Sequence, residues 1–257
     1  MSTWRLTTGT EGPGSAVAER MSVTTREAAG RDSLAYLLGK AAMDVGMQAD
    51  LGATIGAVAR NAVEIIGGVA GSSALFSSRR WRLNLSAATT ARVGEADERQ
   101  FETGDGPSYA AMRQATVVTV RDTAVEQRWR RWASASCELG LRSMVAVPLD
   151  LSPYHWAVMS VYWDRPDQPS RENVAAAALF APHAAVAITN AWQSSMLREA
   201  IQSRHQIGLA QGILMERLGL DARQSFDVLR RHSRDNNIKL NRIAKHVVET
   251  RSLRGSW

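Results

Sequence analysis

The sequence predicts an α+β domain followed by an all-α bundle of three helices. Three observations predict this fold class: strand-like segments that end in a hairpin pattern, a long alanine-rich helix after them, and three amphipathic helical segments near the C-terminus. The 257 residues suffice for two modest domains, and a hydrophobic content of 45% suffices to build a core in each. We place the two domains at residues 33–195 and 196–257.

Residues 1–32 are rich in Thr, Ser, Gly and charged residues and lack periodic apolar residues, so we expect a disordered leader. Whether Met1 or Met21 is the true start is not decided by the sequence. After the leader, apolar residues recur at helical spacing and predict two helices, and the pair Gly67-Gly68 ends the second of them.

Five strand-like segments follow and predict a mainly antiparallel sheet with flanking helices. They are SSALFSS, WRLNLSAAT, TVVTV, SMVAVPLDL and HWAVMSVYW, and the last two surround the turn SPY. The last segment has two largely apolar faces, with Val158 and Tyr162 on one and Met159 and Val161 on the other. This pattern predicts a central strand that is covered on both sides. Short helices are expected after GDGP and over AVEQRWRRWASASCELG.

An alanine-rich helix is predicted to begin after the N-cap Ser170 and to reach as far as Leu218 with interruptions. Pro182 lies inside it and should kink or divide it, because proline removes a backbone donor and clashes with the preceding turn. Beyond the proline, an imperfect apolar seam favours a parallel coiled-coil dimer; the alternative is a single helix packed on its own sheet. The seam consists of Ile188, Trp192, Ser195, Leu197, Ala200, Ile201 and Arg204.

The last fifth of the chain predicts three short helices. Gly219 suits the end of the first, and Asp221 with Gln224 forms a variant of the capping box at the start of the second. Because each helix has one apolar face, the three should pack against each other as a bundle. The expected faces are Ala222, Phe226, Leu229 and Ser233 in the second helix and Leu240, Ile243, Ala244, Val247 and Val248 in the third.

The formal net charge of +6 lies entirely in this C-terminal part. From residue 201 onward 11 Lys and Arg stand against 5 Asp and Glu, which leaves 20 of each kind before it. This asymmetry favours a polyanion as partner; the alternative is an ordinary solvated helix surface. With the apolar stripe of the third helix turned inward, its basic side chains must face outward, where they can neutralise phosphates. The predicted phosphate contacts are Arg230, Arg231, Arg234, Lys239, Arg242 and Lys245.

Two glycines, Gly208 and Gly212, lie four residues apart on one side of the first of these helices. A glycine in a helix interior costs about 1 kcal/mol relative to Ala, so helix stability does not explain them. Their lack of side chains would allow another group to approach closely. The sequence leaves open whether that group is the third helix, a second subunit or a nucleotide base.

Residues 201–250 resemble an ANTAR domain, the three-helix RNA-binding module of transcription antitermination regulators. The resemblance implies binding to paired RNA stem-loops with hexanucleotide loops, which prevents formation of a transcription terminator. Where many members of the family carry Lys, this chain has Gln211, for which we predict contact with a base or a sugar. The matching residues are Ala210, Gly212, Leu214 and Met215 in A-x-G-x-L-M, then Phe226, Leu229 and Arg230, and finally the K-L-x-x-I-A of the third helix.

Residues 35–195 are similar to GAF domains of the kind that precede ANTAR modules in actinobacterial regulators. The matching pieces are Q-x-x-x-G-x-G-P, the V-x-D after a strand, the R-W-x-x-W helix and the G-x-R-S before a strand. The resemblance implies a domain that senses a small molecule or redox state, or that dimerises. Ser108 stands where relatives often carry Cys, which argues against thiol sensing at this position.

Other patterns argue against an enzyme, a metal site and a bound cofactor. The five histidines lack metal-ligand spacing, and no phosphate loop, zinc-protease or serine-hydrolase motif appears. Cys137 is the one cysteine, which excludes a disulfide framework and methionine sulfoxide reductase chemistry that needs several cysteines. We see no apolar run of the length that a bilayer crossing needs and expect a cytoplasmic protein without a membrane partner.

Together these patterns predict a signal-responsive regulator of transcription antitermination. An antiparallel-sheet GAF sensor, which senses a small-molecule ligand or a redox state, would control an ANTAR bundle through a connecting coiled-coil helix that holds a homodimer together. Two alternatives stay open. One is a DNA-binding regulator that uses the third helix for recognition, and the other is a protein-interaction module whose basic stripe meets an acidic partner.

Overall fold

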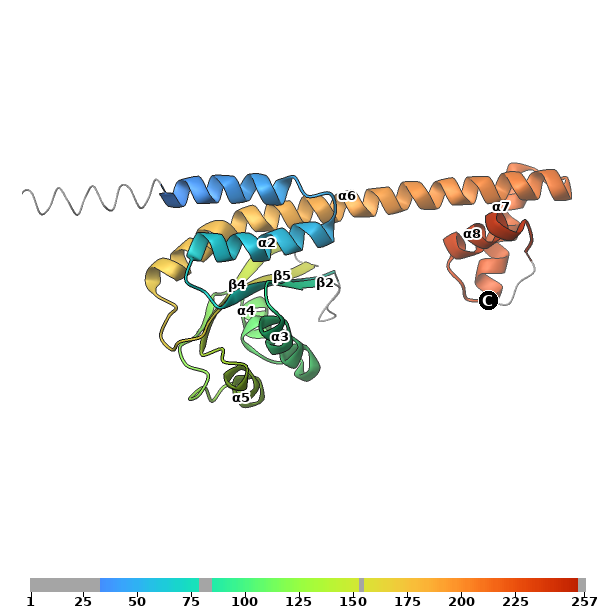
Figure 1. The fold of residues 1–257 in the computed structure, drawn as a ribbon. Helices are drawn as coiled ribbons and strands as arrows, with labels where there is room; N and C mark the ends of the chain where they lie inside the picture. Colours follow the sequence, from blue (N-terminus) through green and yellow to red (C-terminus); the bar gives the residue numbers. More distant parts are fainter. Residues whose placement is uncertain (1–32, 79–84, 153–154, 254–257) are drawn as a thin grey trace, which may run out of the picture. The chain divides into compact units, whose positions relative to one another are not determined.

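The computed structural model describes residues 33–78, 85–152 and 155–253 (Figure 1). The leader expected at residues 1–32 lies outside the described residues. The chain divides into two compact units, Met1–Thr189 and Asn190–Trp257. We call the first the sensor unit and the second the C-terminal unit, and each is described by itself.

The sensor unit is built on a five-stranded antiparallel sheet, as the sequence predicts (Figure 1). The strand order is β2-β1-β5-β4-β3, so that β5 is central. In β5, Met159 pairs with Ala74 of β1 and with Val147 of β4. The strands are β1 (Gly71–Ser77), β2 (Leu85–Ala88), β3 (Val118–Val120), β4 (Ser143–Ser152) and β5 (His155–Trp163).

Helices cover both faces of this sheet, which confirms the expectation for its central strand (Figure 1). On one face the Ser72 hydroxyl of β1 donates to the backbone oxygen of Ala59 in α2 (Leu51–Ile66). On the other face Ser160 of β5 lies 3.0 Å from Ser108 of α4, oxygen to oxygen. The helices on this second face are α3 (Ala91–Thr103), α4 (Pro107–Gln114) and α5 (Arg130–Glu138).

Short-range capping signals mark the helix ends correctly. The backbone N–H of Ala53 donates to the carboxylate of Asp50 at 2.8 Å, and α2 ends at Gly67, whose φ is 65°. By contrast, α3 is not predicted by the sequence. Two of its four buried residues, Asp97 and Gln100, are polar, so its buried face lacks the apolar spacing that indicates a helix.

The alanine-rich segment forms one helix, α6 (Arg171–Leu218), of 48 residues. The N–H of Asn173 donates to the Ser170 hydroxyl at 3.1 Å, which confirms the expected N-cap. A kink or a division is expected at Pro182; the division is wrong, because the helix continues through the proline. Pro182 and Ala178, whose carbonyl has no N–H partner at the proline, are both exposed, so water can satisfy that carbonyl.

Two further expectations for α6 are corrected. Ile188 is fully buried in the sensor unit and cannot belong to an exposed seam, whereas Leu197 and Ile201 are more than half exposed. Among the described residues α6 is also long and apolar enough, by length and composition, to cross a membrane, contrary to the expectation that no such run exists. Of its most apolar window, 44% is buried inside the protein.

The C-terminal unit contains the end of α6 together with α7 (Ala222–Asp235) and α8 (Leu240–Thr250). The capping box is confirmed: Gln224 N–H donates to Asp221 Oδ1 at 2.7 Å and Asp221 N–H to Gln224 Oε1 at 3.0 Å. Gly219 has the expected left-handed φ of 63°. The core of this unit consists of Ala210, Leu214, Leu229, Ile243, Ala244 and Val247.

The buried face of α7 differs in part from the predicted one. Leu229 is buried as expected, but Ser225 is buried too, while Phe226 is half-buried and Ala222 is exposed. The Ser225 hydroxyl donates to the backbone oxygen of Ala222 at 2.9 Å. Because its hydroxyl is satisfied within the helix, serine can occupy a position where the sequence pattern expects an apolar residue.

Candidate functional site

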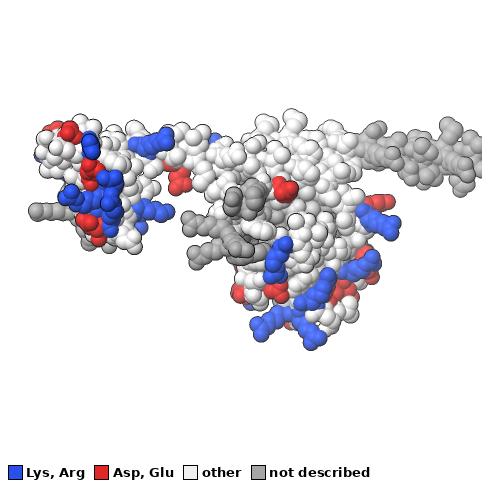
Figure 2. Space-filling view, turned by 180° about the vertical axis from the view of Figure 1, so that it is seen from behind, with Lys and Arg blue, Asp and Glu red and all other residues white. Residues whose placement is uncertain are grey.

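The residues predicted to contact phosphates lie on the outer sides of α7 and α8. In α8 the side chains of Ile243, Ala244 and Val247 are buried, so that Arg242 and Lys245 face away from the core. Figure 2 shows Lys and Arg side chains gathered on the C-terminal unit, with Asp and Glu side chains among them. All six predicted residues are exposed: Arg230, Arg231, Arg234, Lys239, Arg242 and Lys245.

Two of these six residues already have acidic neighbours. Arg230 Nη2 lies 2.7 Å from Asp227 Oδ1, and Lys245 Nζ lies 3.8 Å from Glu249 Oε1. Both pairs are exposed, and such pairs contribute about 0–1 kcal/mol, so a phosphate can replace the carboxylate. The other four residues form no ion pair within the described part of the chain. They present their full charge to an incoming polyanion.

A further cation on α7 was missed by the sequence reasoning. Arg223 is exposed and precedes Arg230 by seven residues, so the two lie on the same side of the helix. In the sequence it stands apart from the basic cluster at the end of α7. Once the start of α7 is known, the helical period places Arg223 on the same side of the helix as Arg230.

Gln211 lies where α6 meets the start of α7 and contacts Ala222, the residue before Arg223. Its Nε2 donates to the backbone oxygen of Ala222 at 2.9 Å. This hydrogen bond joins the two helices and occupies one amide N–H. Contact of Gln211 with a base or a sugar therefore stays a prediction, and its place at the helix junction is a feature that the sequence does not indicate.

Gly208 and Gly212 are exposed on α6, and a Cβ at either position would meet no atom within 4 Å. The third helix of the same chain is thus excluded as the group for which these glycines make room. The group that approaches these glycines is therefore expected to belong to a second subunit or to a nucleotide.

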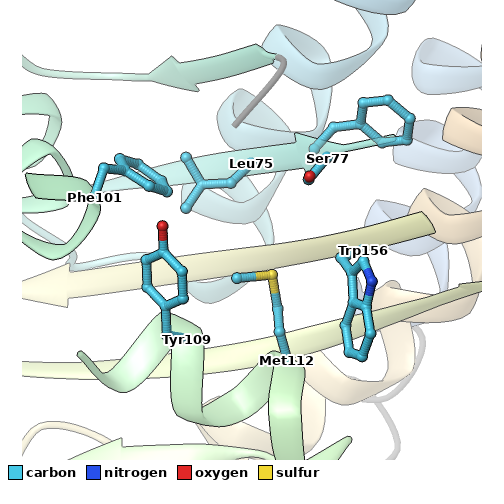
Figure 3. A pocket seen from close by; sticks show the side chains of 7 residues that line it. Leu75, Ser77, Phe101, Tyr109, Met112 and Trp156 are labelled. Atoms are coloured by element: carbon cyan, nitrogen blue, oxygen red, sulfur yellow. The ribbon is translucent and has the colours of Figure 1, made fainter. Parts of the chain in front are cut away.

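The sensor unit contains a small apolar pocket between the sheet and α4 (Figure 3). Tyr109 and Met112 point from α4 toward the strands, and the Tyr109 ring packs edge-to-face on Phe101 with 5.7 Å between the ring centroids. The cavity measures about 10 Å³, room for one water molecule. Its walls are Leu75, Phe76, Ser77, Phe101, Tyr109, Met112 and Trp156.

A wider cavity of about 270 Å³ shares Met112 and Trp156 with the apolar pocket. Asp150 and His155 add polar groups to its wall. Its volume approaches that of pockets which hold small molecules, and the shared residues make Met112 and Trp156 the boundary between the two cavities. The walls combine residues from distant parts of the chain, so no local pattern in the sequence reveals them.

The motif Q-x-x-x-G-x-G-P builds the junction between α3 and α4. Gln100 Oε1 accepts a hydrogen bond from the N–H of Ser108 at 2.8 Å. A Cβ at Gly106, whose φ is 150°, would collide with the Gln100 side chain. Pro107 then occupies the first turn of α4, where its missing N–H costs nothing. Ser108 is buried by this arrangement.

A buried polar cluster crosses the core next to this junction. The Tyr162 hydroxyl donates to Asp97 Oδ1 at 2.6 Å, and Gln100 Nε2 donates to the same oxygen at 3.2 Å. Asp97 Oδ2 and Trp132 Nε1 are buried without a hydrogen-bond partner among the described residues. Burial raises the pKa of Asp97 to about 6, because its effect exceeds that of the hydrogen bonds from neighbouring side chains, which lower the pKa. Burial and the Asp97 charge also raise the pKa of Tyr162.

The described residues contain no group of three or more His, Cys, Asp or Glu side chains that is placed to hold a metal ion. Cys137 is a free, half-buried cysteine on α5. The structure thus offers two places for function: the basic surface of α7 and α8, and the cavities of the sensor unit.

Comparison with known proteins assigns the two parts of the chain to two different families. Residues 48–189, more than half of the chain, match the model of the GAF domain, and residues 195–248 match the model of the ANTAR domain. The search of curated proteins found no match.

Similar solved structures include the GAF domain of a phosphoenolpyruvate-protein phosphotransferase from Coxiella burnetii, at 12% identity, with 63% of this chain and 96% of that chain covered and a TM-score of 0.48. Another is the free methionine-R-sulfoxide reductase from Neisseria meningitidis, at 14% identity, with 63% and 91% covered and a TM-score of 0.46. The GAF and ANTAR matches stand in the order that the sequence predicts, so the chain belongs to the GAF–ANTAR regulators.

Proposed function

We propose that this protein is a cytoplasmic, non-enzymatic regulator whose ANTAR domain binds RNA stem-loops in nascent transcripts and so prevents termination of transcription. The observation that carries the proposal is the set of exposed cations on a three-helix bundle of the ANTAR family. Four of them, Arg231, Arg234, Lys239 and Arg242, have no ion-pair partner within the described residues. Stem-loops bring phosphates close together and expose unstacked bases, which suits a small rigid bundle.

The proposal includes a homodimer through α6. Leu197 and Ile201 are exposed by 63% and 58% and lie four residues apart on one side of the helix. A dimer would present two ANTAR bundles to two neighbouring stem-loops. A small molecule bound in the cavities of the GAF domain would then act by shifting the population of dimer arrangements.

The basic surface is tested by replacing Lys239 and Arg242 with Ala in the full chain. We expect weaker binding of a labelled hairpin RNA and a smaller slope of log K against log salt, lower by about 1 for each phosphate that the variant no longer neutralises. Helix content should not change, because both side chains are exposed. A matched control replaces two exposed cations of the sensor unit, Lys40 and Arg121, and should leave both quantities as they are.

Unchanged RNA affinity in the Lys239→Ala, Arg242→Ala variant would rule out this face. Competition distinguishes the alternatives: unlabelled duplex DNA that displaces the hairpin better than unlabelled hairpin does would favour a DNA-binding regulator. Salt-insensitive binding to an acidic protein without any RNA shift would favour a protein-interaction module.

A further inference from the structure

A groove lies between α3 and α5 on the surface of the sensor unit. It consists of two adjoining hollows of about 730 Å³ and about 380 Å³, and both are lined by Thr103, Arg130 and Arg131. All three of these residues are exposed. The groove shares no wall residue with the apolar pocket or with the wider cavity next to it, so it is a separate feature. It is here called the arginine groove, after Arg99, Arg128, Arg130 and Arg131 on its walls.

Two of the four arginines have no partner within the described part of the chain. Arg99 Nη1 lies 3.0 Å from Glu102 Oε2 on the same helix, and this pair is exposed. The guanidinium groups of Arg130 and Arg131, by contrast, form neither an ion pair nor a hydrogen bond there, and α5 has no acidic residue in its first turn. Figure 2 shows Lys and Arg side chains gathered with Asp and Glu at the end of the sensor unit where Figure 1 places α5. An anion can therefore approach Arg130 and Arg131 without displacing a carboxylate.

The other acidic side chains on the walls do not neutralise this pair of arginines. Asp105 Oδ1 lies 2.9 Å from Arg113 Nη2 and is thus already paired. Glu138 stands at the opposite end of α5, about 12 Å along the helix axis from Arg130. Because residues 1–200 contain 20 Lys and Arg and 20 Asp and Glu, the composition of this part of the chain gives no sign of the local surplus.

A flat surface for stacking lies beside the two free arginines. The Arg128 guanidinium lies over the Trp129 ring, 4.4 Å from its centroid. It is fixed there because its Nη2 donates to Glu126 Oε2 at 2.6 Å and to the backbone oxygen of Thr119 at 3.0 Å. The Arg128 side chain is nevertheless 54% exposed and lines the groove. Unpaired RNA bases stack on guanidinium planes and aromatic rings of this kind.

We propose that the arginine groove binds single-stranded RNA next to a stem-loop, with Arg130 and Arg131 on phosphates and Arg128 against a base. The inference rests on the proposed RNA-binding function and extends it from the ANTAR domain to the sensor unit. Proteins bind single strands by combining cations for the backbone with a surface on which bases stack. An acidic protein segment would meet the cations but leave the stacking surface unused. A small ligand would stay largely in water between exposed walls, whereas small-molecule sites bury most of the ligand.

The test compares two labelled RNAs on the full chain: a hairpin with a blunt stem, and the same hairpin with an unpaired extension on each side. For the unaltered protein we expect the extension to increase affinity and to steepen the slope of log K against log salt by about 1.4, from about 0.7 for each of two phosphates. The advantage of the extended RNA should accordingly fall about sevenfold between about 50 and 200 mM salt. Arg130→Ala with Arg131→Ala should abolish this advantage and leave binding of the blunt hairpin unchanged.

Arg165→Ala with Arg171→Ala is the matched control. Both arginines are exposed, lie off the groove and have no ion pair among the described residues. This control should bind both RNAs as the unaltered protein does. Equal melting temperatures would show that all variants fold.

Separate outcomes distinguish this inference from the proposed function. An extension that adds no affinity to the unaltered protein would overturn the inference and leave the proposed function, which the blunt hairpin tests, in place. A gain that persists in the Arg130→Ala, Arg131→Ala variant would also overturn it, because the extension would then bind elsewhere. If poly-glutamate binds through these arginines while the extension adds nothing, the groove belongs to an acidic protein partner. Absence of blunt-hairpin binding, with the extended RNA still bound through Arg130 and Arg131, would contradict the proposed function and support the inference.

Discussion

At the scale of the residue, Asp97 is the clearest case of a side chain kept in a costly environment. The residue is only 3% exposed. Its Oδ1 atom accepts hydrogen bonds from Tyr162 and Gln100, and its Oδ2 atom has no hydrogen-bond partner among the described residues. A buried polar atom without a partner costs about 1–3 kcal/mol. Such a cluster ties α3 to the central strand and specifies how the two pack.

Asp97→Asn should change how stability depends on pH. Because the folded pKa of Asp97, about 6, lies above its ordinary value of 3.8, the stabilising contribution is complete below about pH 4 and is lost as the pH rises through 6. The loss is on the order of 3 kcal/mol, because the pKa rises from 3.8 to about 6 and each tenfold change in proton affinity corresponds to about 1.4 kcal/mol. Asn does not titrate, so the variant should lack this loss. Urea unfolding should therefore show that the free energy of unfolding of the variant, relative to that of the unaltered protein, is higher at pH 7 than at pH 4.

Asp122→Asn supplies a control of opposite sign. The Ala124 N–H, followed by Arg142, lowers the pKa of Asp122, so its contribution is present above the ordinary pKa and is lost as the pH falls. If Asp97→Asn leaves the pH dependence of unfolding as it is, the carboxyl does not titrate in the folded core.

At the scale of the element, the exposed glycines of α6 lower the stability of the helix and leave room for a binding partner. A Cβ at Gly208 or Gly212 would meet no atom within 4 Å in the described part of the chain, so no steric reason in the monomer keeps them. Helix propensity alone would favour alanine at both positions. The two residues are therefore where a partner of α6 is expected to come closest.

Gly208→Ala with Gly212→Ala should raise the stability of the C-terminal unit and lower its function. Each substitution should add about 0.8–1 kcal/mol to the free energy of unfolding, because alanine is the better helix former. If a second subunit or a nucleotide uses the space, dimerisation or hairpin binding should weaken at the same time, as sedimentation and RNA titration would show. Higher stability with both binding constants unchanged would mean that no partner approaches there.

At the scale of the whole molecule, the proposed dimer would carry two ANTAR bundles and should recognise paired stem-loops as a unit. An RNA with two hairpins at a suitable distance should bind about 10²–10⁴ times more tightly than an RNA with one, because the second contact is intramolecular. Leu197→Glu with Ile201→Glu should remove this gain without weakening single-hairpin binding. Equal affinity of the unaltered protein for both RNAs would contradict a dimer that binds two loops together.

Much of the fold was accessible from the sequence because its signals are local. The N-caps Ser170 and Asp221 and the glycines Gly67 and Gly219 act within four residues of the helix end they mark, and all four are confirmed. The five strands are found for a similar reason, since alternation and turn residues act over short spans. The helix α3 was missed because it buries polar residues whose partners lie far away in the chain.

The candidate sites also differ in whether local sequence patterns predict them. The exposed cations at the end of α7 and on α8 follow from helical period and composition, so the sequence by itself identified these residues of the proposed RNA-binding surface, whereas Arg223 was added only by the observed start of α7. Only the tertiary structure decided that Ile188 turns inward while Val186 turns outward, that Gln211 joins two helices, and that Met112 and Trp156 line one cavity. Outward direction depends on what the rest of the chain covers, and a cavity depends on side chains brought together by long-range packing, which no local pattern encodes.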